Sequence, residues 1–394
     1  MRLLLAVIVL LGVQNVFGQE PTSESLSLLT PTEQLDSNFE FHGFLSQGYV
    51  QSTNNNFLPN STQGTTKFTE AGVNVNKQFT NDLRAGFQIF ARDYGVTGDY
   101  RASFDWFLID YHWRDYLGIR AGRIKLPFGL YNDTSDIDSA RDPVLLPQSI
   151  YPIQDRDYLL AQTGVELYGL IDMGSRGGSL EYRLYRGTIQ IDTPVVPPTS
   201  TIEYIDVNLP YVYGGRLIWE PPVRGLRAGV SVQRLQLDTD LYSTTVSKSA
   251  SVDLPITMAV GSVEFTYRAF QFVAEYSKLW AKAESSDTSV YPEGAQTSEK
   301  YYAMATYKVR PWLHPGVYYS AAYPYENVRT SRQDQWIDYA GFVRIDLYSN
   351  WLLKFEAHYM DGTAALIPSY NGGTSTANMP RNWALFLAKT TVSF

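Results

Sequence analysis

Sixteen segments of this chain alternate apolar and polar residues, and the connections between them alternate strictly between short and long. A period of two is typical of β-strands whose two faces meet different surroundings. The order of connections places every short turn at one end of a sheet and every long loop at the other, which a soluble β-sandwich has no reason to do. The alternating segments are 39–53, 64–79, 82–92, 100–113, 115–124, 161–173, 178–187, 211–220, 225–237, 256–267, 270–283, 298–308, 312–323, 335–348, 351–363 and 381–394.

Turn-forming residues mark both kinds of connection. Most short connections carry Gly, Pro or Asn, because Gly permits positive φ, Pro fixes φ, and Asn hydrogen-bonds to nearby backbone. The long connections are rich in Asn, Ser, Thr, Asp, Gly and Pro. They cover 54–63, 93–99, 125–160, 188–210, 238–255, 284–297, 324–334 and 364–380.

The N-terminal residues have the pattern of an export signal. Met1 and Arg2 give a short basic start, 3–13 is an apolar run, and small or modest residues favour cleavage after Gly18. We therefore expect a signal peptide over 1–18 and a flexible, acidic periplasmic segment over 19–38. The apolar run is too short for a transmembrane helix, and no other stretch approaches about 18 consecutive apolar residues. These features leave a secreted soluble protein or an outer-membrane barrel.

Composition excludes several classes of function. The chain has no cysteine, which excludes disulfides, thiolate metal sites and cysteine nucleophiles. Its net charge of −8 argues against nucleic acid as a partner. The mean hydropathy of −0.21 is compatible with a barrel, because a barrel strand spans a membrane with only about 9–11 alternating residues.

The two faces of single strands separate the remaining possibilities. In 351–360, the alternating face that carries Lys354, Glu356 and His358 is too charged for the core of a sandwich, but it suits a watery lumen. Closing the sheet also removes the unpaired edges that hydrocarbon cannot satisfy. We therefore predict an all-β fold: a transmembrane antiparallel β-barrel of about 16 strands over 39–394.

Aromatic residues gather at strand ends, where a transmembrane barrel has its interfacial girdles. The general preference of aromatic residues for strands is the alternative, but so many of them flank short turns that we favour girdles. They are Trp113, Tyr116, Trp219, Tyr267, Phe270, Trp280, Tyr301, Trp312, Tyr348, Trp351 and Trp383.

The longest stretch without alternation runs from Gly122 to Tyr158 and contains six Asp and four Pro residues. A loop of this length in a compact domain is usually functional. Its connection, 125–160, is the third of the long ones. We call it the long loop, and we predict that it folds into the bore of the barrel and sets what can pass.

Two motifs resemble the sixteen-stranded outer-membrane porin superfamily. The first is the run GRIKLPFG at 122–129 with PQSIY at 147–151, which resembles porin-like proteins of proteobacteria. The second is the alternating last strand that ends on Phe394, which resembles the assembly signal of outer-membrane barrels. The resemblance implies a homotrimer of water-filled barrels in the outer membrane of a Gram-negative bacterium, each narrowed by its third outer loop. Its implied partners are the lipid bilayer with lipopolysaccharide, the outer-membrane assembly machinery and small hydrophilic solutes.

Charged residues suggest where the pore is narrowest. Carboxylates of the long loop would face a basic wall, and the opposed charges would create a transverse field that favours polar solutes. The alternative is that these Asp residues lie on the outer surface or cap turns. The predicted constriction residues are Asp133, Asp136, Asp138, Asp142, Arg84, Arg92, Arg120, Arg123 and Lys125, and the wall also includes Arg183, Arg216 and Arg344.

Other chemistries fit the sequence less well. Asp133, Asp136 and Asp138 lack the glycine and distal glutamate of a calcium loop, so we predict no metal and no cofactor. The chain has four histidines and no HExxH or GxSxG motif, and the pairs His358–Glu356 and His42–Glu40 are the only hints of catalysis. We therefore predict a porin for passive diffusion, with no catalytic residues. The alternatives are a channel biased towards sugars or organic anions, an outer-membrane enzyme, and an adhesin or structural barrel.

Overall fold

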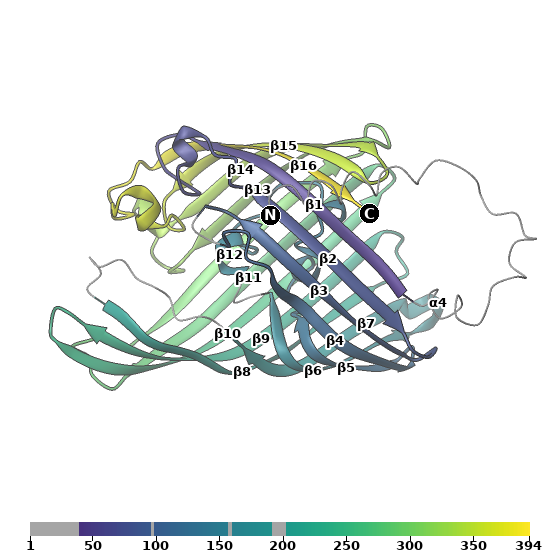
Figure 1. Ribbon diagram of the computed structural model, residues 1–394, viewed down its shortest axis with the longest axis horizontal. Helices are drawn as coiled ribbons and strands as arrows, with labels where there is room; N and C mark the ends of the chain where they lie inside the picture. Colours follow the sequence, from purple (N-terminus) through teal and green to yellow (C-terminus); the bar gives the residue numbers. More distant parts are fainter. Residues whose placement is uncertain (1–38, 96–97, 157–159, 191–201) are drawn as a thin grey trace, which may run out of the picture. The chain divides into compact units, whose positions relative to one another are not determined.

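The computed structural model describes residues 39–95, 98–156, 160–190 and 202–394, and the predicted signal peptide and lead-in lie outside these ranges. Within them, sixteen antiparallel strands form one closed barrel in which neighbours in space are neighbours in sequence, and the last strand pairs with the first (Figure 1). The strands are β1 (Phe39–Ser52), β2 (Thr69–Gln78), β3 (Leu83–Asp93), β4 (Ser103–Arg114), β5 (Leu117–Lys125), β6 (Ala161–Asp172), β7 (Ser179–Ile189), β8 (Ile202–Glu220), β9 (Leu226–Ser243), β10 (Lys248–Tyr267), β11 (Phe270–Ser285), β12 (Gly294–Tyr307), β13 (Leu313–Tyr323), β14 (Trp336–Tyr348), β15 (Trp351–Gly362) and β16 (Asn382–Ser393).

Helix is almost absent from the described part of the chain. It consists of one four-residue helix, α4 (Gly174–Gly177), and short 3-10 turns in the connections. No helix among the described residues is long and apolar enough to cross a membrane. The fold therefore rests on strand pairing.

Burial on the strands is inverted relative to a soluble protein. On β15, Lys354, Glu356 and His358 are buried, whereas Phe355 and Tyr359 are exposed. Apolar side chains outside and charged side chains inside are the arrangement of a barrel that meets lipid with its outer face. The two faces that the sequence predicts for this strand are confirmed.

Strands β8, β9 and β10 are longer than the sequence predicts. β9 and β10 extend through most of the predicted loop 238–255 and are joined by only four residues, 244–247, and β8 begins at Ile202, within the predicted loop 188–210. The prediction was wrong because polar residues on the exposed face, such as Asp238 and Asp253, hide the alternation there. The buried face still packs in this region, with Leu241 and Val252 in a small apolar cluster. Figure 1 shows these strands reaching beyond their neighbours.

Most of the predicted girdle residues are exposed, including Trp113, Trp312 and Tyr348. Trp383 is an exception, because it is 2% exposed and packs edge-to-face on Trp336 with the ring centroids 5.5 Å apart. Its position on β16 points to the buried face, so the assignment of Trp383 to a girdle was wrong.

Phe394 completes the seam between the first and last strands. Its backbone N–H donates to the carbonyl of Gly43 at 3.0 Å, and its carbonyl accepts from the Gly43 N–H at 2.9 Å. A Cβ atom on Gly43 would lie 2.4 Å from the Phe394 ring, so a side chain at position 43 would displace that ring. The terminal residue therefore takes part in closing the barrel.

Deletion of Phe394 should lower the amount of folded barrel in the outer membrane. The two lost backbone hydrogen bonds are worth about 1–3 kcal/mol together, and the deletion also removes the aromatic residue that we predict to act as an assembly signal. The measurement is the heat-modifiable, folded fraction in isolated outer membranes. Phe394→Trp is the control and should keep near-normal levels, whereas normal levels of the deletion would contradict the role of Phe394.

Candidate functional site

The long loop joins β5 to β6, and the structure describes its residues 126–156 and 160. It contains three short 3-10 turns, Asn132–Thr134, Asp138–Ala140 and Ile153–Asp155. Leu126, Phe128, Leu146 and Ile150 are buried among apolar side chains of the strands, in a cluster that extends from β7 to β14. Hydrophobic packing therefore fixes the path of the loop, and the positions of its charged residues follow from that path.

Asp133 lies between two strand arginines. Its Oδ2 atom is 2.6 Å from Arg183 Nη1 on β7, and its Oδ1 atom is 3.3 Å from Arg216 Nη1 on β8. Arg183 also pairs with Glu166 on β6 at 2.7 Å. This network connects the first turn of the loop to three adjacent strands.

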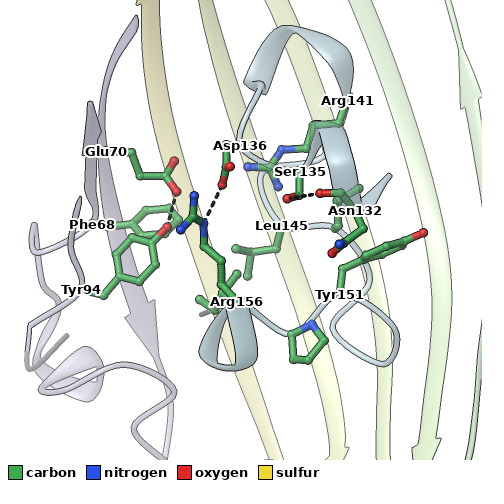
Figure 2. Close-up of a pocket in the computed structure, with 13 residues that line it drawn as sticks. Phe68, Glu70, Tyr94, Asn132, Ser135, Asp136, Arg141, Leu145, Tyr151 and Arg156 are labelled. Carbon is green, nitrogen blue, oxygen red and sulfur yellow. Dashed lines mark hydrogen bonds and ion pairs between the residues drawn. The ribbon is translucent and has the colours of Figure 1, made fainter. Parts of the chain in front are cut away.

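Asp136 pairs with cations at both ends of the loop. Its Oδ2 atom accepts from Lys125 Nζ at 2.8 Å, and its Oδ1 atom accepts from Arg156 Nε at 2.7 Å. Arg156 also donates to Asp105 of β4 at 2.7 Å. Figure 2 shows Arg156 extending between Asp136 and the side chains of Glu70 and Tyr94, which hydrogen-bond to each other.

Asp138 is buried against the seam strands. Its carboxylate lies 2.8 Å from Lys389 Nζ and 3.0 Å from Arg141 Nη2, and it accepts from the Thr391 hydroxyl at 2.6 Å. Lys354 of β15 donates to the backbone carbonyls of Asp138 and Arg141, each at 2.7 Å. Lys354 and Lys389 were not among the predicted site residues, although their positions on the charged faces of alternating strands were a usable signal.

Asp142 and the remaining predicted arginines occupy other networks. Asp142 lies 3.2 Å from His314 Nδ1 and 3.5 Å from Arg344 Nη1. Arg84 and Arg120 both pair with Asp110 of β4, at 2.7 and 3.1 Å, rather than with the loop. The two other predicted cations contact neither Asp133 nor Asp138: Arg123 donates to the carbonyl of Asp105 at 3.0 Å, and Arg92 lies over the Tyr94 ring at 5.3 Å.

Two buried glutamates hold the backbone of the loop. Glu275 of β11 accepts from the Leu130 N–H at 2.9 Å and from the Tyr151 hydroxyl at 2.5 Å. Glu356 of β15 accepts from the N–H groups of Val144 and Leu145, the latter at 3.2 Å. Strand carboxylates thus bind loop donors while strand lysines and arginines bind loop acceptors.

The loop carboxylates are stabilised in their charged form. Burial alone would raise the pKa of Asp133, but Arg216 and Arg183 hold it below the ordinary 3.8. Against the same effect of burial, Arg156 and Lys125 lower the pKa of Asp136, and Lys389, Lys354 and Arg141 lower that of Asp138. Because these pKa values are lowered in the docked loop, their contribution to docking is present above the ordinary pKa and is lost only as pH falls through the lowered values.

The long loop should therefore stay docked when pH falls from 5 to 4, where a free aspartate takes up protons. The measurement is cleavage of the detergent-solubilised barrel by pepsin, read out by mass spectrometry at sites within the loop. We expect equal cleavage at pH 5 and pH 4, after correction for pepsin activity on an unfolded standard. A cleavage rate that rises between these two values would contradict the lowered pKa values.

Two spaces border the loop. The smaller, about 50 Å³, lies between the loop and the β2–β3 wall near Glu70 and Tyr94 (Figure 2), and has room for one or two waters. The larger, about 850 Å³, reaches the short β12–β13 connection at Lys308 and Pro311. Its charged lining residues are Asp133, Arg141, Asp142, Arg216, Arg227, Glu264, Lys308, Arg344 and Asp346. Within the described ranges, no group of three or more His, Asp or Glu side chains is placed to hold a metal ion.

Comparisons with known proteins identify the fold. No family model matches the sequence, and no curated protein matches it. Among solved structures, OmpT of Vibrio cholerae is 11% identical with a TM-score of 0.59, covering 90% of this chain and 97% of its own. The anion-selective porin of Comamonas acidovorans is 10% identical with a TM-score of 0.53, covering 90% and 99%. The outer-membrane channel DcaP of Acinetobacter baumannii is 14% identical with a TM-score of 0.52, covering 90% and 97%. The chain therefore has the fold of the sixteen-stranded outer-membrane porins.

Proposed function

We propose that this chain is a porin, a passive channel for small hydrophilic solutes or ions in the outer membrane of a Gram-negative bacterium. The observation that carries the proposal is the anchoring of the long loop to strands far apart in the closed barrel, from Asp105 on β4 to Lys389 on β16. In this proposal the loop lies inside the barrel and narrows it. The inverted burial and the likeness to solved porins and channels support it.

We infer that unpaired charges set the ion preference. Asp133, Asp136 and Asp138 are each matched by nearby cations, and matched charges largely cancel at a distance. The selectivity of the channel then depends on side chains that border the larger space and have no partner. In this proposal, the selectivity comes from single unpaired charges beside the passage. It does not come from a transverse field between the loop carboxylates and a separate basic wall, as the sequence predicted.

The burial of His358 favours a passive channel over an enzyme. His358 Nδ1 lies 2.9 Å from Asp338 Oδ1, and Nε2 lies 2.9 Å from Glu356 Oε1, with the ring fully buried. Glu356 also accepts from loop backbone, so the group is covered by the loop. Such a histidine stabilises packing and is closed to a substrate.

Reconstitution into a planar lipid bilayer tests the proposed function. A channel gives stepwise increases in conductance as single molecules insert. Folding is monitored in parallel by heat-modifiable migration in a gel. Folded, heat-modifiable protein that inserts without any conductance would contradict the proposal.

Lys308→Glu should shift the reversal potential towards cations. Lys308 is exposed and borders the larger space, and its side chain has no hydrogen bond or ion pair with the residues that the structure describes. A reversed charge there acts directly on ions in the passage and costs little folding energy. Arg224→Glu in the short β8–β9 connection is the matched control, since it reverses an exposed charge that does not border that space. Equal shifts in both variants would place Lys308 outside the ion path.

We also propose that the barrel assembles as a homotrimer. The solved trimer form of Vibrio cholerae OmpT supports this assembly for a related fold. Cross-linking of the detergent-solubilised protein at low concentration should give a limiting species of three chains. A limiting species of one chain would contradict it.

A further inference from the structure

The first residues of β8 form an open edge of the sheet. β7 pairs with β8 only as far as Leu209, which stands opposite Ile189. On its other side, β8 stays paired with β9 to its first residue, where Ile202 stands opposite Ser243. Along 203–208, one edge of β8 therefore has a neighbouring strand, and the other edge has none among the residues that the structure describes. Figure 1 shows this part of β8 extending beyond the other strands.

The backbone of this edge is placed to pair with a further strand. The Asp206 carbonyl accepts from the Thr239 hydroxyl of β9 at 2.8 Å, so it points towards β9. Neighbouring residues of a strand direct their backbone groups to opposite edges, so the N–H and C=O of Val207 point to the open edge. All residues of 203–208 except Val207 are exposed, and none is proline. Such a row of unpaired backbone groups is a template to which another extended segment adds.

The outer face beside this edge is acidic. Asp206 stands opposite Asp240 of β9, and Asn208 stands opposite Asp238. Asp238 in turn stands opposite Asp253 of β10. Like charges directly opposite one another on neighbouring strands are unfavourable. None of these carboxylates forms an ion pair within the described ranges, so this face lacks a compensating cation.

The charges decide which kind of strand fits. Pairing with the same edge of a second copy would bring Glu203 and Asp206 against identical acids, which disfavours that arrangement. A strand with basic residues at every second position places them beside the acids, and its intervening residues lie on the other face with Tyr204 and Val207. We propose that 203–208 binds an extended cationic segment of another polypeptide as an added strand. This inference rests on the proposed outer-membrane location, which puts the long-loop end of the barrel outside the cell.

Fluorescence anisotropy on the full, folded barrel in a zwitterionic detergent tests this proposal. The probe is a short labelled peptide that alternates Lys and Val. We expect it to bind, and we expect roughly tenfold weaker binding of a peptide alternating Glu and Val and of an isomer alternating D-Lys and L-Val. The isomer has the same charge, but its side chains do not alternate between the two faces of a strand. Binding of the Lys–Val peptide should also slow hydrogen exchange at the amides of 203–208.

Two kinds of variant separate backbone pairing from charge. Val207→Pro removes the N–H that points to the open edge and should weaken binding roughly tenfold. Val207→Ala loses the same side chain but keeps the N–H, and should stay within about twofold of the parent. Asp206→Asn and Glu203→Gln should each weaken binding about threefold at low salt. Asp82→Asn removes an exposed carboxylate at the opposite end of the barrel and should bind as the parent does.

The outcomes separate strand addition from other contacts. Parental binding by Val207→Pro, equal binding of the D-Lys isomer, or unchanged exchange in 203–208 would overturn strand addition. A chain that binds no Lys–Val peptide but self-associates unless it carries Val207→Pro would make a second copy the occupant and also overturn the proposal. Heat-modifiable migration checks folding, and if Val207→Pro does not fold, parental affinity in the double variant Glu203→Gln, Asp206→Asn still overturns it. A barrel that binds the peptide without conducting ions would overturn the proposed function alone.

Discussion

Asp138→Ala should raise the single-channel conductance of the reconstituted barrel and expose the long loop to protease. The carboxylate of Asp138 contacts Lys389, Arg141 and Thr391 in a fully buried position. Removing one partner from a buried ion cluster typically costs about 3–5 kcal/mol, because the remaining charges are left uncompensated. That cost shifts the ratio of docked to released loop by more than about 100-fold. Under the proposed function, a released loop widens the passage.

The loss should fall on the loop rather than on the barrel. Sixteen strands are hydrogen-bonded to both neighbours without help from the loop, and Lys389 keeps its second partner, Glu70, when Asp138 is gone. We therefore expect the variant to remain heat-modifiable in gels while its conductance rises. Conductance and proteolysis within 126–156 are measured on the same preparation.

Asp82→Ala is the matched control for this experiment. Asp82 lies exposed in the short β2–β3 connection, and its side chain makes no hydrogen bond or ion pair with the residues that the structure describes. The Asp82→Ala variant loses one carboxylate that does not contact the long loop, so the conductance of this variant should equal that of the parent protein. An Asp138→Ala barrel with parental conductance and parental protease resistance would show that the ion cluster does not hold the loop.

The barrel was predictable because its determinants are local. Alternation with a period of two is visible within a single strand, as in Lys354, Glu356 and His358 on one face of β15. A short turn such as Ser349–Asn350 then forces its two strands to pair. The failures arose where this local signal is masked. The outer parts of β9 and β10 carry Asp238 and Asp253 on the face that meets water, so polarity there indicated a loop although the strands continue.

The sequence predicted which acidic and which basic residues could belong to the candidate site, but it could not predict how they pair. Which acid meets which base depends on the path of the loop, and that path is set by burial of residues such as Phe128 and Leu146 against distant strands. Asp138 and Lys389 are separated by most of the barrel sequence, so no spacing rule connects them. Arg84 and Arg120 were assigned to the wall on alternation alone, and in the structure Asp110 on the neighbouring strand is their partner.

Tyr151→Ala should release the first half of the long loop, with increased hydrogen exchange at the amides of Leu130 and Tyr131. The Tyr151 hydroxyl accepts from both of these N–H groups, at 2.9 and 3.1 Å, and donates to Glu275 at 2.5 Å. Its ring packs on Tyr131 and Tyr302 and is 7% exposed. Loss of a buried aromatic side chain costs about 3–5 kcal/mol, and here the buried Glu275 also loses a donor.

The close approach of the Tyr151 hydroxyl to the loop backbone explains why the motif GRIKLPFG at 122–129 ends in glycine. Gly129 has a φ of 59°, and a Cβ atom there would lie 2.2 Å from the Tyr151 hydroxyl oxygen. Only glycine fits both the conformation and the contact. The turn at Gly129 and the side chain of Tyr151 therefore act together, and removing either one should loosen the same amides.

Tyr151→Phe separates packing from hydrogen bonding in this prediction. Phenylalanine keeps the ring and loses the hydroxyl, which should cost about 1–3 kcal/mol and increase exchange less than alanine does. Tyr348→Ala is the control. Tyr348 is 68% exposed on the outside of the barrel, so its loss should leave hydrogen exchange in the long loop unchanged. Exchange in Tyr151→Phe as fast as in Tyr151→Ala would mean that the hydroxyl network alone anchors the loop. Parental exchange in both variants would contradict the anchoring role of Tyr151, and would leave Glu275 held by Tyr302 and Ser262 without the loop.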